Sequence, residues 1–222
     1  MLKNYFKTKT YPMTSVLKSF FSIAIFSLLV IPTFAQISFG IKGGTNVAEF
    51  SFQEQGATIP QETINGFTLG AVLEVGLGGN VFLQPEAIFI QKGSQLQILN
   101  DNNKFNVNYL DIPVLLKIKL LNSNLLNINV LAGPSFGLAL NGEQSTGSQT
   151  IDINFGGENG LKRFDLGINA GGGVGINLGS IGVFGDVRYL FGVSNISEDA
   201  DREIKNRGLN LSVGLMFRLL GR

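Results

Sequence analysis

The sequence predicts an all-β protein: an eight-stranded antiparallel up-and-down β-barrel that spans a membrane. Three observations predict it. Apolar and polar side chains alternate in eight segments, the connections alternate between short and long, and the first 35 residues have the pattern of an export signal. Successive side chains of a strand point to opposite faces, so each segment has one apolar and one polar face. In a transmembrane barrel the apolar face meets lipid and the polar face lines the lumen.

The N-terminus has the order of a cleaved signal peptide. Residues 1–35 contain four lysines and no acidic residue, an apolar stretch at residues 20–31, and the small residues Thr33 and Ala35 before Gln36. The apolar stretch has 12 residues, well short of the ~20 that a membrane-spanning helix needs. We therefore expect a signal peptide at residues 1–35 and an outer-membrane β-barrel domain at residues 36–222. Met13 is an alternative start, because a complete signal also follows it.

This assignment predicts processing. N-terminal sequencing of the membrane-inserted protein is expected to begin at or near Gln36, because small residues occupy the −3 and −1 positions before it. A mature protein that retains residues 20–31 would contradict the assignment.

The first four predicted strands follow the signal. They cover residues 37–44, 67–77, 81–92 and 105–120. Their clearest apolar faces are Ile37, Phe39 and Ile41; Phe67, Leu69, Ala71, Leu73, Val75 and Leu77; and Leu110, Ile112, Val114, Leu116, Ile118 and Leu120. The segment at 81–92 alternates imperfectly, because Ile88 and Ile90 share a face with Gln84, Glu86 and Lys92.

The last four predicted strands cover residues 127–140, 163–178, 181–193 and 209–219. Their apolar faces are Ile128, Val130, Ala132, Phe136 and Leu138; Phe164, Leu166, Ile168, Val174, Ile176 and Leu178; Val183, Val187, Tyr189 and Phe191; and Leu209, Leu211, Val213, Leu215, Phe217 and Leu219. Most of the eight segments have the ~9–11 residues, or slightly more, that a tilted strand needs to cross a bilayer.

The connections support the same topology. Those at residues 78–80, 121–126 and 179–180 are short, whereas the other four have 12 to 21 residues, at 49–65, 93–104, 141–161 and 194–206. Outer-membrane barrels have short periplasmic turns and long outer loops. The predicted outer loops hold 11 acidic residues and only Lys104, Arg202 and Lys205 as cations.

Charged residues on the polar faces predict a network inside the lumen. We expect it to contain Lys42, Glu74, Glu86, Asp111, Lys117, Arg163, Asp165, Asp186, Arg188 and Arg218, with Lys92 and Lys119 on the same faces. Buried charges must be paired, because an isolated buried charge is very costly. We expect Arg188 to bridge to an acid on a neighbouring strand, since adjacent strands bring such residues within reach.

The composition limits the chemistry. There is no Cys, His or Trp, which excludes thiolate chemistry, a Ser-His-Asp triad and a His-ligated metal. After removal of the signal, 13 basic residues face 16 acidic ones, so no basic surface for nucleic acid is expected. A hydrolase with two catalytic carboxylates stays formally open, but these carboxylates have cations beside them.

Two motifs are similar to ligand-binding sequences, but each lacks a feature that ligand binding would need. The glycine run at 171–175 lacks the following helix that a nucleotide-binding loop needs. Glu198, Asp199, Asp201 and Glu203 lack the spacing of a Ca²⁺ loop. We therefore expect no catalytic residue, cofactor or metal.

Several motifs resemble a known family. ISFGIKGGTN at 37–46, FLQPEAIFIQKG at 82–93, YLDIPVLL at 109–116, Gly133-Pro134 and DVRYL at 186–190 are similar to PorT-like outer-membrane β-barrel proteins of Gram-negative bacteria. The resemblance implies an eight-stranded barrel in the outer membrane. It implies no specific activity, because most members of that family have no known function.

Together these observations predict a monomeric barrel in outer-membrane lipid, with a structural or interaction role. Side chains fill the lumen, and acidic outer loops contact other envelope proteins. One alternative is a small-ligand binding protein or narrow channel in the outer membrane. Another is a soluble lipocalin-like barrel with its apolar face inward, which would need no detergent.

Overall fold

A computed structural model describes residues 36–98, 101–147, 149–157 and 160–220. The predicted signal peptide lies outside these described residues. No helix in the described part of the chain is long and apolar enough to cross a membrane.

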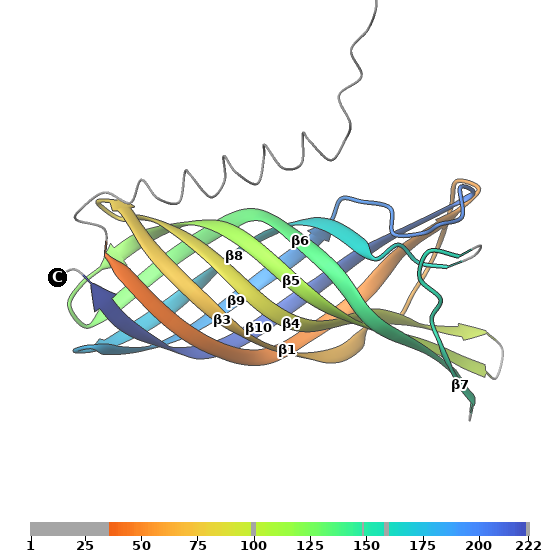
Figure 1. Ribbon diagram of the computed structural model, residues 1–222, viewed down its shortest axis with the longest axis horizontal. Helices are drawn as coiled ribbons and strands as arrows, with labels where there is room; N and C mark the ends of the chain where they lie inside the picture. The colour runs from red at the N-terminus through yellow and green to blue at the C-terminus, as the bar shows by residue number, and fades with distance from the viewer. Residues whose placement is uncertain (1–35, 99–100, 148, 158–159, 221–222) are drawn as a thin grey trace, which may run out of the picture. The chain divides into compact units, whose positions relative to one another are not determined.

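Eight strands form a closed antiparallel ring (Figure 1). They are β1 (Ile37–Glu54), β3 (Ile64–Gly78), β4 (Val81–Ile98), β5 (Asp101–Asn122), β6 (Leu126–Thr146), β8 (Phe164–Leu178), β9 (Ile181–Gly192) and β10 (Arg202–Leu220). Each pairs with the next along the chain, and β10 pairs with β1. The predicted fold class is confirmed.

Closure of the ring suits a bilayer. β1 and β10 are paired from Ile37↔Leu220 to Glu54↔Arg202, so neither end of the sheet has a free edge along the barrel wall. In hydrocarbon every backbone N–H and C=O must find a partner within the protein, and a closed ring provides one.

The side chains sort by the predicted period of two. Val213 is 68% exposed on the outer face of β10, whereas its neighbour Ser212 is 5% exposed and points inward. The outer face carries large apolar side chains around the ring, among them Phe67 and Leu69 on β3, Phe136 on β6 and Val174 on β8. A band of this kind is buried in lipid rather than exposed to water.

Six of the eight ring strands, all but β8 and β9, are longer than predicted at the end opposite the short turns. β1 continues to Glu54, β4 to Ile98, and β10 already begins at Arg202. Much of the predicted loops at 49–65, 93–104, 141–161 and 194–206 is therefore strand. Ladder hydrogen bonds continue beyond the apolar band, as the pairs Glu54↔Arg202 and Ile98↔Asp101 show. The sequence did not predict these extensions, because their side chains are polar. The alternation of apolar and polar residues shows where a strand contacts lipid, and it does not show where backbone pairing ends.

Two short strands lie outside the ring. β2 (Ala57–Ile59) pairs with the end of β1, and β7 (Gln149–Asp152) pairs with the end of β6. We call the part of the protein beyond the apolar band the outer extension; it comprises β2, β7 and the described residues at 49–65, 93–104, 141–161 and 194–206. At the opposite end, Gly79 and Gly179 have φ values of 56° and 76° in two-residue turns, a region that glycine enters without steric cost.

A buried apolar cluster lies inside the barrel towards the outer extension. It comprises Phe50, Ile88, Ile90, Val107, Tyr109, Ala139, Leu161, Ile196 and Ile204. Leu161 and Ile196 come from segments between strands, and the Ile196 N–H donates to the Ile204 carbonyl at 2.8 Å. This apolar cluster explains the imperfect alternation of β4, because Ile88 and Ile90 face other apolar side chains inside the barrel.

Candidate functional site

The charged side chains of the lumen form three groups along the barrel. The central cluster is Lys42, Glu86, Asp186 and Arg188. The outer cluster, next to the apolar cluster, is Lys92, Asp111 and Asp165. The inner cluster, near the short turns, is Glu74, Lys117 and Lys119.

The central cluster is a balanced set of two cations and two anions. The Arg188 guanidinium lies between two carboxylates: Nη1 and Nη2 are each 2.8 Å from an oxygen of Glu86, and Nε is 2.8 Å from Oδ1 of Asp186. Lys42 Nζ is 2.9 Å from Glu86 Oε2, so Glu86 pairs with both cations. All four side chains are at most 3% exposed. Two-point contacts between guanidinium and carboxylate are among the strongest and most directional ion pairs.

This arrangement corrects the predicted partner of Arg188. Glu86 is on β4, which is not adjacent to β9 in the ring, so the bridge crosses the lumen. The prediction of an acid on a neighbouring strand is wrong, because the narrow ring brings opposite walls within side-chain reach. Asp186, the second partner, is on the same strand as Arg188.

Neutral polar groups complete the central cluster. Gln84 Nε2 donates to Glu86 Oε1 at 2.6 Å, and Ser212 Oγ donates to Asp186 Oδ1 at 3.0 Å. Ionised carboxylates accept several hydrogen bonds, and each one offsets part of the cost of burial. Both residues lie on inward faces, so the alternation alone would have placed them in the lumen.

The outer cluster has one cation and two anions. Lys92 Nζ is 3.0 Å from Asp165 Oδ2 and 3.5 Å from Asp111 Oδ1. Asp165 also accepts hydrogen bonds from Asn206 Nδ2 at 2.9 Å and from Ser194 Oγ at 3.2 Å. These donors stabilise the Asp165 carboxylate in a cluster that has only one cation for two anions. Ser194 belongs to a segment between strands, so no sequence pattern placed it here.

The inner cluster has the opposite imbalance. Glu74 accepts from Lys117 at 2.7 Å and from Lys119 at 2.8 Å, one lysine on each carboxylate oxygen. Lys119 Nζ also lies 3.8 Å from the centre of the Phe82 ring, a favourable position for a cation. Glu74 therefore forms ion pairs with both lysines.

Arg163 and Arg218 do not join these clusters. Arg163 is exposed and precedes β8; it donates to the Ala139 carbonyl at 3.2 Å, and its guanidinium lies over Phe155. Its predicted place in the lumen network is wrong, because Arg163 precedes the first residue of β8 and the alternation does not extend past the end of a strand. Arg218 is exposed near the end of β10 and has no ion pair with any residue that the structure describes.

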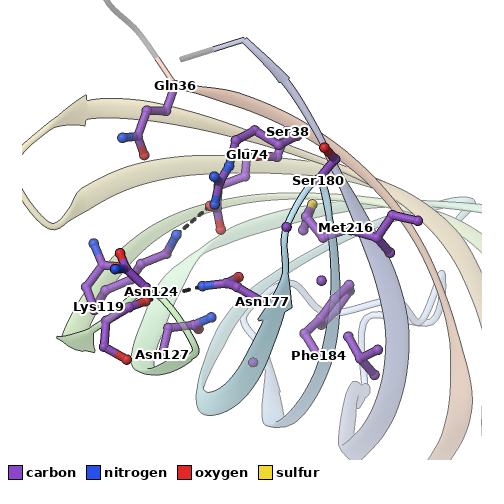
Figure 2. Close-up of a pocket in the computed structure, with 18 of the residues that line it drawn as sticks. Gln36, Ser38, Glu74, Lys119, Asn124, Asn127, Asn177, Ser180, Phe184 and Met216 are labelled. Atoms are coloured by element: carbon purple, nitrogen blue, oxygen red, sulfur yellow. Dashed lines mark hydrogen bonds and ion pairs between the residues drawn. The ribbon is translucent and has the colours of Figure 1, made fainter. Parts of the chain in front are cut away.

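A polar cavity of about 390 Å³ opens beyond the inner cluster, at the short-turn end of the barrel. Its charged lining residues are Glu74, Lys117, Lys119 and Arg218. Its lining also includes Asn127, Asn177 and the residues at 122–124 and 179–182, in and beside two of the short connections. Figure 2 shows Glu74, Lys119 and Asn177 arranged around this cavity. We call it the inner cavity.

The glycine run at 171–175 and the acidic segment at 198–203 both have structural roles. The glycines at 171–175 lie within β8, and a Cβ on Gly171 would be 2.1 Å from the Val187 carbonyl oxygen of β9. That backbone approach requires glycine. In the acidic segment, Asp199 accepts from the Asp201 N–H at 3.0 Å and pairs with Arg202 at 3.5 Å. Within the described ranges, no group of three or more acidic side chains is placed to hold a metal ion.

Comparison with known proteins shows the following similarities. The model of the outer membrane protein beta-barrel domain family matches residues 34–198. A search of curated protein sequences finds no match. The outer membrane protein OprG from Pseudomonas aeruginosa is similar in structure, with a TM-score of 0.50 and 12% identity over 84% of this chain and 97% of that one. Such a likeness shows the fold alone.

Two further solved structures match more weakly. Neisserial surface protein A has a TM-score of 0.49 and 10% identity, covering 82% of this chain and 97% of its own. The outer membrane protease OmpT from Escherichia coli has a TM-score of 0.44 and 10% identity, covering 83% and 97%. Neither similarity carries an argument about activity.

Proposed function

The chain belongs to the outer membrane protein beta-barrel family, and we propose that it is a plugged, non-enzymatic barrel with a structural or interaction role. Its place is the outer membrane of a Gram-negative bacterium. Within the family, the motifs at 37–46, 82–93 and 109–116 support a PorT-like member. We further propose that residues 1–35 are its cleaved signal peptide.

One observation carries the proposal: side chains fill the lumen at successive levels. The central cluster joins β1, β4 and β9 across the barrel through ion pairs of 2.8 to 2.9 Å. The outer cluster and the apolar cluster lie beyond it. An eight-stranded ring encloses only enough space for side chains, so this filling supports a barrel without a continuous water path.

The outer extension supports a role in interaction. β1 and β10 stay paired to Glu54↔Arg202, and the Arg202–Glu54 ion pair of 2.9 Å lies at their ends. Leu161 and Ile196 anchor the intervening segments in the apolar cluster. We propose that this ordered, acidic surface contacts other envelope proteins, and that the barrel itself is monomeric. Loops on a rigid scaffold are where binding residues concentrate.

The buried acids argue against a carboxylate hydrolase. Glu86 and Asp186 are both committed to Arg188, and Asp111 and Asp165 both lie beside Lys92. Catalysis of that kind needs two carboxyl groups that reach the substrate, whereas these four are buried in ion pairs. The absence of His from the whole sequence excludes imidazole as the base.

Planar-bilayer recording tests the plugged lumen. The purified protein is expected to give small or no conductance, because the central cluster and the apolar cluster both lie across the path. A trimeric porin inserted under the same conditions serves as the positive control for membrane insertion and recording. A large, stable conductance of the porin type from this protein would overturn the proposal.

A further inference from the structure

The inner cavity is open on the side of the short turns and closed on the other. Exposed residues Ser123, Asn124 and Ser180 form its rim, whereas the central cluster fills the barrel above it. Short turns of outer-membrane barrels face the periplasm. The cavity therefore opens towards the periplasm, and with the proposed plugged lumen it is a blind pocket that a periplasmic solute can enter and cannot pass through.

Its charged lining is unbalanced. Among the side chains, Lys117, Lys119 and Arg218 contribute three positive charges and Glu74 contributes one negative charge, which leaves an excess of two. Gln36 also lines the cavity, so the proposed cleavage before it would add the positive charge of its α-amino group. The central cluster, by contrast, is neutral, so a surplus of cations is not a general property of this lumen. Arg218 has no ion-pair partner among the described residues, although other cations in the barrel do.

We propose that the inner cavity binds a compact dianion, either a phosphate monoester or a dicarboxylate, from the periplasm. Two negative charges would balance the excess of two positive charges on the side chains of the lining. This inference is independent of the role proposed for the outer extension, because the two surfaces lie at opposite ends of the barrel.

The donors are suited to such a ligand. Each lysine gives one N–H to Glu74, and an ammonium group has three, so two donors on each lysine remain. The Arg218 guanidinium offers a planar set of donors that matches carboxylate and phosphate oxygens. The carboxamides of Asn124, Asn127 and Asn177 in the same lining add neutral donors and acceptors.

The size of the cavity fits a small molecule. Ligand pockets commonly have volumes of about 300–1,000 Å³, and 390 Å³ lies at the lower end of that range. Phe184 and Met216 also line the cavity (Figure 2), so a short apolar part of the ligand would have a place beside the charged groups.

Isothermal titration calorimetry in an uncharged detergent at low ionic strength tests this proposal. Two probes are used, succinate for the dicarboxylate class and glycerol 3-phosphate for the phosphate class. We expect saturable binding of at least one probe with one site per barrel. Acetate should bind at least about tenfold more weakly, because it carries half the charge, and added salt should weaken binding.

Three variants locate the site. Arg218→Gln is expected to weaken binding about tenfold or more, because it removes the unpaired cation. Asn177→Asp keeps the side-chain shape and adds a negative charge to the lining, so it should also weaken binding. Arg207→Gln is the matched control, since Arg207 is an exposed arginine on the same strand and does not line the cavity. It should bind like the wild type.

The probe that binds identifies the ligand class. Binding of succinate alone supports a dicarboxylate, and binding of glycerol 3-phosphate alone supports a phosphate monoester. The proposal is overturned if neither probe gives saturable heat up to about 10 mM. It is also overturned if Arg218→Gln and Asn177→Asp, folded as judged by β-sheet circular dichroism, bind as tightly as Arg207→Gln.

Discussion

Glu86→Ala is expected to destabilise the folded barrel by about 3–5 kcal/mol. Glu86 is fully buried and is the shared partner of Lys42 at 2.9 Å and Arg188 at 2.8 Å. Its removal leaves two buried cations with Asp186 as their remaining nearby acid, and an uncompensated buried charge is much more costly than a lost contact. Urea unfolding in lipid vesicles, followed by circular dichroism, measures the change.

The matched control for this experiment is Arg202→Ala in the outer extension. Arg202 and Glu54 form an equally short ion pair, 2.9 Å, but their side chains are 39% and 38% exposed. Exposed pairs contribute only about 0–1 kcal/mol. Losses of similar size for Glu86→Ala and Arg202→Ala would show that the central cluster does not stabilise the barrel through buried pairing.

Val213→Arg is expected to cost about 2–4 kcal/mol of stability. Val213 is 68% exposed in the middle of the outer apolar face of β10, where a guanidinium would replace lipid contact. The effect depends on depth, because a charge near the interface can reach water and headgroups. The same vesicle-based urea unfolding measures it.

Leu219→Arg provides the comparison at a different depth. Leu219 is also outward and exposed, but it lies near the end of β10, where the cost should fall to about 0–1 kcal/mol. Equal costs at the two positions would contradict the placement of the apolar band. A cost near zero at Val213 would count against burial of this face in lipid.

The ring and its inward and outward faces could be predicted from the sequence because both follow from local rules. The period of two separates Val213 from Ser212 without knowledge of any other strand. Short connections such as 179–180 force neighbouring strands to be antiparallel. An even number of alternating segments with an apolar outer face then leaves a closed barrel as the consistent arrangement.

The outer extension could not be predicted in the same way. Alternation of apolar and polar residues reports contact with lipid, and it stops where the bilayer stops. Backbone pairing has no such limit, so β4 and β5 continue together to Ile98↔Asp101. The apolar cluster also escaped prediction, because Leu161 and Ile196 lie far apart in sequence and outside the strands.

Partners within the lumen depend on the closed ring rather than on any single strand. Alternation places Glu86 and Arg188 inside, but it does not state at which height or on which opposite wall they meet. Strand tilt and stagger, which are set by closure, decide that. Arg163 and Arg218 illustrate the same point, since both carry the expected charge and neither forms an ion pair with an acid that the structure describes.

The pairing of β1 with β10 also determines how the protein can assemble. Every other junction of the ring joins strands that follow one another in the sequence, but Ile37↔Leu220 joins the two ends of the barrel domain. Before β10 is in place, β1 and β9 each present a row of unpaired N–H and C=O groups, which hydrocarbon does not tolerate. Strands therefore cannot enter the bilayer one at a time as stable units. We therefore expect the barrel to close as it inserts, after its last strand has been delivered, and we expect a chain that ends before Arg202 to form no smaller barrel.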